Sequence, residues 1–237
     1  MKISVITAYT LNYEIGNYTK KINENYCKLN GYDFVSYNET PAVIKTRHPA
    51  WFKIFYLIKR LNENIDDYVM WIDADAFFCN NLLKIESWIN ETTEDKEFFI
   101  CRDAGYSYID YKKNPESKLN SGVMIFKNTD FIKKYLNNIL INPIYKPNYN
   151  KIRTLNKQTK TIGWDQAAIR HTCISNIYNI KEKLHIIENI NFNNNCLNPK
   201  LYIKNGGYII HLTNFSGKFG NKKINTIREY NNILNHD

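Results

Sequence analysis

The sequence predicts an α/β domain in which helices flank a mainly parallel central sheet. Short apolar runs of strand type alternate with longer stretches whose apolar residues recur at helical spacing. Polar side chains follow several of the strand ends, which is where open α/β sheets bind their ligands. A length of 237 residues suits one such domain, and no linker separates two parts. We therefore expect a single domain over residues 1–237.

The chain opens with a predicted strand at 3–7, a helix at 14–29 and a second strand at 32–37. Gly31 ends the helix, and this β-loop-α-β order is how a mainly parallel sheet begins. Residues after the first strand could line a pocket for a nucleotide base, or could form an ordinary loop. These residues are Ala8, Tyr9 and Thr10.

A second helix is expected at 50–61, with Pro49 at its start because proline is tolerated in the first helical turn. Lys53 belongs to that first turn. A lysine in this position is more often solvated, but it could also approach a phosphate. The central strand follows at 68–72.

Two carboxylates arrive where the central strand ends. Residues two apart in an extended chain point to the same side, so Asp73 and Asp75 can face one point together. Hard oxygen ligands of this kind suit Mg²⁺ or Mn²⁺, especially when phosphates complete the coordination. The alternative is an acidic turn. Apolar neighbours such as Trp71 and Phe77 favour a bound cation, because partly desolvated carboxylates are costly without one.

Further polar residues stand beside later strands. Arg102 and Asp103 follow a predicted strand at 98–101, in a position where a sugar could be held, and a surface loop is expected at 104–118. Next comes a small polar turn that leads into an apolar strand. Its residues could hydrogen-bond sugar hydroxyls or simply make the turn, and its glycine permits close backbone approach. They are Asn120, Ser121 and Gly122.

The last third of the chain supplies four more candidates. Asp165 and Gln166 open a helix, and Asp165 could be only an N-cap or could be catalytic. His211 at a strand end could be a third metal ligand, and Lys218 after Gly217 could neutralise a diphosphate. The other expected elements are helices at 82–89, 131–141 and 164–174, strands at 184–187 and 207–211, and a polar basic loop at 143–161.

Composition sets limits on partners and location. The formal net charge of +9 favours anionic partners. The five cysteines form no C-x-x-C pair, so neither a zinc site nor a disulfide framework is supported. No apolar run approaches the roughly 20 residues that span a bilayer. We expect a cytoplasmic protein without a transmembrane segment, for which peripheral membrane contact and the oligomeric state stay open.

Four windows of this sequence, in this order, resemble the GT-A nucleotide-sugar glycosyltransferases. The resemblance is nearest to the retaining galactosyl- and xylosyltransferases of family 34, followed by the glycogenin-like family 8. It extends from Ile3 to about Lys218. The windows are Trp51-x-Lys53, Trp71-Ile72-Asp73-Ala74-Asp75-Ala76-Phe77, Leu119-Asn120-Ser121-Gly122-Val123, and Trp164-Asp165-Gln166 with the late His211.

The resemblance implies a Rossmann-like GT-A domain that moves a hexose or pentose from a UDP-sugar to a glycan or other hydroxyl acceptor with retention. Residues 1–118 would be the nucleotide-binding half, 119–220 the acceptor and sugar half, and 221–237 a peripheral helical tail. Asp75 and His211 would bind Mn²⁺ or Mg²⁺, Asp73 would contact the metal or the ribose, and Asp165 with Gln166 would lie on the sugar face opposite the leaving group. With the candidates named above, the expected donor contacts are Ala8, Tyr9, Thr10, Lys53, Asp73, Ala74, Arg102, Asp103, Asn120, Ser121, Gly122, Gly217 and Lys218.

Two other functions also fit parts of the sequence. A metal-dependent phosphohydrolase or nucleotidyltransferase could use the paired aspartates, but two-metal enzymes need further carboxylates, and only Asp103 and Asp165 are obvious. A nucleic-acid-binding module is suggested by the net charge and the 18 tyrosines. The basic residues are dispersed and show no nucleic-acid-recognition signature, so no nucleic-acid partner is expected.

Overall fold

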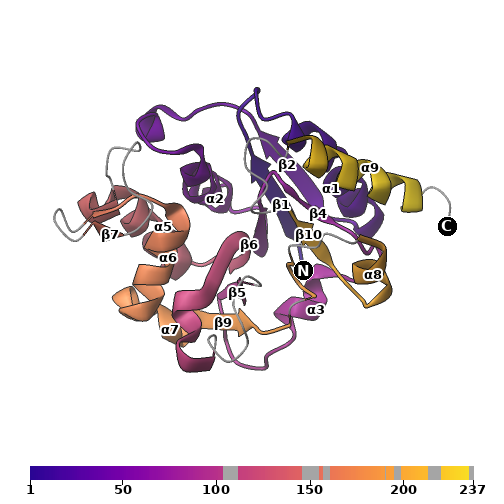
Figure 1. The fold of residues 1–237 in the computed structure, drawn as a ribbon. Coiled ribbons are helices and arrows are strands. Elements are labelled where there is room, and N and C mark those ends of the chain that lie inside the picture. Colours follow the sequence, from indigo (N-terminus) through magenta and orange to yellow (C-terminus); the bar gives the residue numbers. More distant parts are fainter. Residues whose placement is uncertain are drawn as a thin grey trace.

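A six-stranded sheet runs through the centre of the protein, and helices pack on both of its faces (Figure 1). The computed structural model describes residues 1–103, 112–145, 155–156, 161–189, 191–194, 199–212 and 220–234. Its strands are β1 (Ile3–Ala8), β2 (Asp33–Tyr37), β3 (Tyr68–Ile72), β4 (Ala76–Phe78), β5 (Phe98–Arg102), β6 (Leu119–Lys127), β7 (Leu155–Asn156), β8 (Thr161–Ile162), β9 (Leu184–Ile187) and β10 (Ile209–His211). Its α-helices are α1 (Ile15–Asn30), α2 (Phe52–Asn62), α3 (Ile85–Ile89), α5 (Asp130–Ile141), α6 (Asp165–Ile174), α7 (Ile180–Lys183), α8 (Pro199–Lys204) and α9 (Gly220–Leu234).

The strand order of the central sheet is β2-β1-β3-β6-β5-β9. Strands β2, β1 and β3 run parallel, as do β5 and β9, whereas β6 is antiparallel to both of its neighbours. The predicted α/β fold with a mainly parallel sheet is therefore confirmed. A second small sheet pairs β4 with β10, so that the chain just after the paired aspartates lies beside the end of the last strand.

Successive side chains along a strand point to opposite faces of the sheet, and this divides the core into layers. In β3, Val69 and Trp71 point into a cluster formed with α2, α5 and α6, while Met70 and Ile72 point into a cluster under α1 and α3. A third cluster joins β4 and β10 to α1, α8 and α9. The helix α9 lies along α1 (Figure 1), so the C-terminal part of the chain returns to the N-terminal part.

Several element boundaries differ from those the sequence predicts. The polar turn expected at Asn120 and Ser121 is wrong, because β6 already begins at Leu119. Pairing with both neighbours fixes these residues in the sheet, where the register against β5 shifts between Ile100 and Cys101. The helix expected at 82–89 is confined to α3, and α2 is preceded by a 3-10 turn, Pro49–Trp51. The expected loops at 104–118 and 143–161 lie partly outside the described residues, and the described parts include 3-10 turns at Pro115–Lys118 and Pro143–Tyr145.

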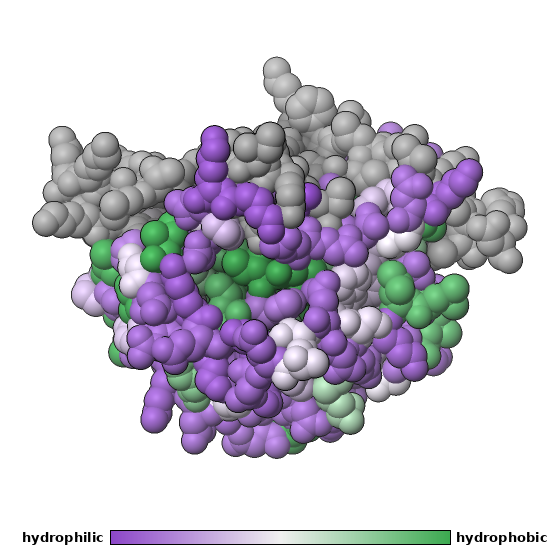
Figure 2. All heavy atoms as spheres, turned by 90° about the horizontal axis from the view of Figure 1, so that it is seen from below, coloured by the Kyte–Doolittle hydropathy of each residue, from purple (hydrophilic) through white to green (hydrophobic). Residues whose placement is uncertain are grey.

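The outer surface agrees with a chain rich in polar residues. Figure 2 shows one face that is mostly hydrophilic, with hydrophobic side chains in separate patches. Among the described residues, no helix has both the length and the apolar character that a bilayer crossing requires. Cys27, Cys101 and Cys173 are buried free thiols, and burial raises the pKa of Cys101 and of Cys173 to about 12. These thiols are therefore protonated and unreactive at neutral pH.

Candidate functional site

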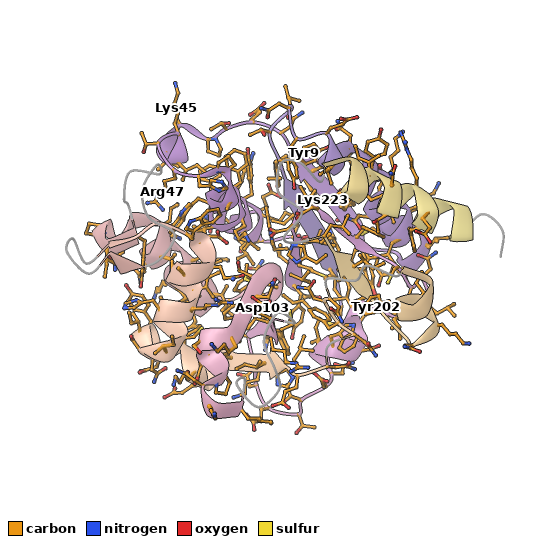
Figure 3. All side chains as sticks on the ribbon, viewed as in Figure 1. Tyr9, Lys45, Arg47, Asp103, Tyr202 and Lys223 are labelled. Carbon is orange, nitrogen blue, oxygen red and sulfur yellow. The ribbon has the colours of Figure 1, made fainter. Side chains whose placement is uncertain are left out.

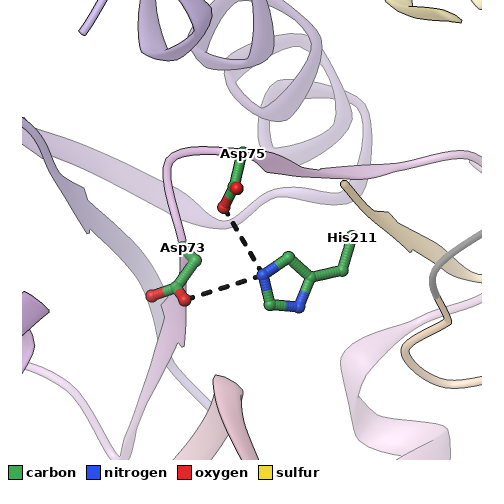
Figure 4. Close-up of side chains that lie close together, drawn as sticks. All are labelled: Asp73, Asp75 and His211. Atoms are coloured by element: carbon green, nitrogen blue, oxygen red, sulfur yellow. Dashed lines mark ion pairs between the residues drawn. The ribbon is translucent and has the colours of Figure 1, made fainter. Parts of the chain in front are cut away.

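Asp73, Asp75 and His211 form one cluster at the end of β3 (Figure 4). Nε2 of His211 lies 3.6 Å from Oδ2 of Asp73 and 3.4 Å from Oδ1 of Asp75. Each residue offers one ligand atom, and these atoms all lie within 4.8 Å of one another. The structure thus brings together three residues that the sequence places up to 138 positions apart, from 73 to 211.

Backbone pairing explains why the cluster forms. His211 pairs with Ala76 across the antiparallel β4–β10 ladder, which puts its side chain next to Asp75. The amide of Leu212 also donates to the carbonyl of Asp75 at 2.9 Å. On the other side, the amide of Asp73 donates to the carbonyl of Gly122 at 2.7 Å. Both aspartates are therefore held by their main chains as well as by their side chains.

Gly122 makes room for the imidazole of His211. A Cβ atom at this position would lie 2.0 Å from Cε1 and 2.6 Å from Nδ1 of His211, and 2.9 Å from Oδ1 of Asn120. No side chain larger than hydrogen fits there without displacing the ring. The close backbone approach expected of this glycine is therefore made towards His211.

The cluster fits a divalent cation of the Mn²⁺ or Mg²⁺ type. Two carboxylate oxygens and one imidazole nitrogen are a donor set that suits Mn²⁺, while Mg²⁺ prefers oxygen ligands. His211 is 4% exposed, and its Nδ1 has no hydrogen-bond partner among the described residues. An ion would bind the other ring nitrogen, Nε2, which lies 3.6 Å from Oδ2 of Asp73 and 3.4 Å from Oδ1 of Asp75, so that one cation could contact all three side chains.

Burial and neighbouring charges shift the two aspartates in opposite directions. Burial raises the pKa of Asp73, against the opposing charges of Lys53 and His211. Burial would also raise the pKa of Asp75, but hydrogen bonds and charges from His211 and Lys223 outweigh it and lower that pKa well below its usual range. Asp75 is thus the firmly ionised member of the pair, and a cation near Asp73 would offset the cost of its burial.

Lys53 connects this cluster to the start of α6. Its Nζ lies 3.1 Å from Oδ1 of Asp73 and 2.8 Å from Oδ2 of Asp165, and it donates to the carbonyl oxygen of Ser121 at 3.0 Å. The side chain is 3% exposed, so the solvated lysine considered from the sequence is wrong. Burial would lower its pKa, but the charges of Asp165 and Asp73 raise it above its usual value. Lys53 is therefore a charged link between two carboxylates.

Asp165 and Gln166, in the first turn of α6, contact Ser121 of β6. Oδ2 of Asp165 accepts from Oγ of Ser121 at 2.9 Å, and Oε1 of Gln166 accepts from the amide of Ser121 at 3.0 Å. Trp164, not Asp165, is the N-cap residue of α6, so the capping role considered for Asp165 is wrong. Asp165 is 2% exposed, and the Lys53 ammonium compensates its charge.

The other residues predicted to contact the donor make contacts of their own within the fold. Oδ1 of Asn120 accepts from the amide of Gly122 at 2.8 Å and from Nδ2 of Asn193 at 3.2 Å, which gives Asn120 a role in shaping β6. Asp103 forms an ion pair with Arg170 at 3.0 Å, and Arg102 ends β5 beside it. The carbonyl of Ala74 accepts a hydrogen bond from the hydroxyl of Thr19. Ala8 ends β1, the ring of Tyr9 packs on Gly16, and the carbonyl of Thr10 accepts from the amide of Tyr13. Gly217 and Lys218 lie outside the described residues.

Two residues at the cluster were not foreseen from the sequence. Lys223 reaches it from α9 (Figure 3), and its Nζ lies 2.7 Å from Oδ2 of Asp75. The hydroxyl of Tyr13 donates to the same oxygen at 3.2 Å. Most of α9 thus lies in the tail predicted at 221–237, and the helix contributes a buried lysine to the site. Helical spacing marks neither residue, because their importance arises only from tertiary contact.

Comparison with solved structures reveals the kind of fold that carries this cluster. A glycosyltransferase involved in the glycosylation of the major capsid of PBCV-1 matches with a TM-score of 0.67 at 14% sequence identity, over 97% of this chain and 100% of that chain. The present chain has a glycosyltransferase fold. The glycosyltransferase GlyE of Streptococcus pneumoniae TIGR4 matches with a TM-score of 0.54 at 12% identity, over 100% of this chain and 63% of GlyE. No family model and no curated protein sequence matches the chain. The predicted resemblance to GT-A glycosyltransferases is confirmed at the level of the fold.

Proposed function

We propose that this protein is a metal-dependent glycosyltransferase that moves a hexose or pentose from a UDP-sugar to an acceptor hydroxyl with retention of anomeric configuration. One observation carries the proposal. On a glycosyltransferase fold, Asp73, Asp75 and His211 converge at the carboxyl end of β3, the edge at which open α/β sheets bind ligands.

The bound metal would supply positive charge for the departing diphosphate. The protein's own residues do the positioning. Lys53 joins Asp73, on the metal side, to Asp165, on the side proposed for the sugar, through contacts of 3.1 and 2.8 Å. A shift of either carboxylate therefore affects the other. This arrangement suits a reaction in which the leaving diphosphate and the sugar must be aligned.

Asp165 and Gln166 are proposed to stabilise positive charge at the anomeric carbon. Lys53 and Ser121 both contact Oδ2 of Asp165, which favours an electrostatic role over nucleophilic attack by that oxygen. Gln166 is fixed by the amide of Ser121 and can present its side-chain amide group to a sugar. In this scheme a phosphate oxygen on the leaving-group side takes the proton of the acceptor hydroxyl.

The contacts in the site do not favour a two-metal phosphohydrolase. Such an enzyme would draw further ligands from Asp103 and Asp165. Asp103 instead pairs with Arg170 at 3.0 Å, and Asp165 pairs with Lys53 at 2.8 Å. Among the described residues, neither carboxylate belongs to the cluster of possible ligand atoms that Asp73, Asp75 and His211 form.

Thermal unfolding with nucleoside diphosphates tests the proposal directly. The panel is UDP, ADP, GDP and CDP, each with Mn²⁺, Mg²⁺ or EDTA. At a UDP concentration 100 times the Kd, binding adds about 2.7 kcal/mol to the free energy of unfolding. For a domain of this size that raises Tm by about 5–11 °C. We expect a UDP shift that requires Mn²⁺ and is absent in Asp75→Ala.

The matched control is Asp130→Ala, which removes an exposed carboxylate at the start of α5. It should keep the full shift. Absence of a shift with every nucleotide would reduce Asp73 and Asp75 to an acidic turn and end the transferase proposal. If UDP binds, UDP-sugar hydrolysis and anomeric NMR of the transferred sugar then test the sugar and the retention.

A further inference from the structure

Each aspartate of the cluster turns only one oxygen towards the metal position. Oδ1 of Asp73 is held by Nε1 of Trp71 at 2.7 Å and Nζ of Lys53 at 3.1 Å, which leaves Oδ2 facing His211. Oδ2 of Asp75 is held by Nζ of Lys223 at 2.7 Å, which leaves Oδ1 facing His211. A lysine therefore occupies the outer oxygen of each carboxylate, and the described residues offer three ligand atoms, one from each member of the cluster.

Lys223 is anchored in this position by the helix that carries it. Its side chain is 6% exposed, and its Nζ is also 3.5 Å from the hydroxyl of Tyr13. One helical turn and two turns further on, Ile227 and Tyr230 are fully buried, and the Tyr230 ring lies 5.0 Å from that of Phe77 on β4. Packing of α9 thus holds the ammonium group beside Asp75.

The fixed charges nearly balance before any ion binds. The connected carboxylates are those of Asp73, Asp75 and Asp165, and the connected ammonium groups are those of Lys53 and Lys223. Leaving out His211, which binds a metal ion through a neutral ring, these five described groups carry a net charge of −1. A divalent cation alone would change it to +1, whereas a cation together with a diphosphate that carries at least two negative charges would make the site negative again.

We propose that Lys223 makes divalent metal binding conditional on the nucleotide diphosphate. Its charge opposes the metal ion alone and is compensated only when the diphosphate arrives, so metal and nucleotide bind with positive coupling. This inference rests on the proposed donor site. It assigns to α9 a role in the order of ligand binding, beyond the ligand set itself.

The test measures free Mn²⁺ by electron paramagnetic resonance during titration, with and without UDP. Loss of the like charge in Lys223→Met should tighten the binding of Mn²⁺ alone by about tenfold. The factor by which UDP increases Mn²⁺ affinity should fall by about the same amount. Lys223→Arg keeps the charge and should keep wild-type coupling. Arg228→Met removes an exposed positive charge from the same helix and should behave like wild type.

Unchanged or weaker Mn²⁺ binding in Lys223→Met would overturn the inference and reduce Lys223 to an anchor for α9. Lys223→Gln keeps a hydrogen-bond donor for Asp75 without the charge, so it must reproduce the tighter binding if the methionine variant is unstable. The two proposals fail separately. If the wild type binds Mn²⁺ together with UDP, and both Lys223→Met and Lys223→Gln bind Mn²⁺ as the wild type does, only the proposed coupling is refuted. If neither the wild type nor the two variants bind Mn²⁺ or UDP, the proposed donor site is refuted as well.

Discussion

Replacement of Gly122 by alanine should disable the metal cluster through a single methyl group. The new Cβ would lie 2.0 Å from Cε1 and 2.6 Å from Nδ1 of His211, distances that force the ring to move. The sheet on both sides of β6 resists a backbone shift, so the imidazole must give way. Overpacking of this kind costs about 1–3 kcal/mol. At the length of this domain, Tm should fall by about 2–12 °C.

The larger effect should fall on Mn²⁺-dependent UDP binding. A displaced His211 removes one of three protein ligands, and changes even to outer-shell partners weaken metal sites by about 10- to 100-fold. Isothermal titration with UDP at fixed Mn²⁺ should therefore show at least that loss in Gly122→Ala. The control is Gly207→Ala, whose Cβ would meet the Tyr202 ring at 2.3 Å outside the cluster. It should lose stability but keep its affinity. Wild-type affinity in Gly122→Ala would refute the assignment of His211.

Three further substitutions probe the carboxylates around Lys53 and Lys223. Lys53→Met leaves buried Asp165 and partly buried Asp73 without their ammonium partner and should lower the free energy of unfolding in urea by about 3–5 kcal/mol; a loss below about 1 kcal/mol would contradict the link. Asp165→Asn should lower kcat by on the order of 100-fold while Mn²⁺-dependent UDP affinity stays at the wild-type value, and an unchanged kcat would remove Asp165 from the mechanism. Burial raises the pKa of Asp75, but contacts with His211 and Lys223 more than reverse this, so its stabilising contribution is complete above the unfolded pKa of about 3.9 and fades as pH falls below it. Urea unfolding from pH 6 to pH 3 should show a difference in the free energy of unfolding between wild type and Asp75→Asn that becomes smaller at the acid end. A difference that stays constant with pH would contradict the lowered pKa of Asp75.

The sheet was predictable because its strands are apolar runs with clear ends. β3 and β5 are buried on both faces, so their sequences read as continuous apolar stretches. The start of β6 was not predictable in the same way. Asn120, Ser121 and Gly122 have the composition of a turn, and only pairing with β3 and β5 makes them strand residues. Tertiary contacts decided that boundary against local preference.

The cluster of Asp73, Asp75 and His211 was predictable for a different reason. Asp73 and Asp75 follow a buried strand, where carboxylates are costly unless a cation or another partner compensates them. A lone histidine carries no such signal. His211 gained its place in the prediction from the order of the windows in the chain. Its proximity to Asp75 comes from the β4–β10 ladder, in a short strand that the sequence analysis did not predict.

The two lysines show most clearly where sequence reasoning stops. Lys53 and Lys223 each occupy a helix that carries other basic residues, and composition treats every such lysine as a solvated charge. Their burial is decided by carboxylates on other elements, since the ammonium groups lie 2.8 and 2.7 Å from Asp165 and Asp75. A buried lysine is stable only as part of such a pair. Once the carboxylates are known to be buried, their cations must be sought on the helices packed beside them, and α2 and α9 are the helices that provide them here.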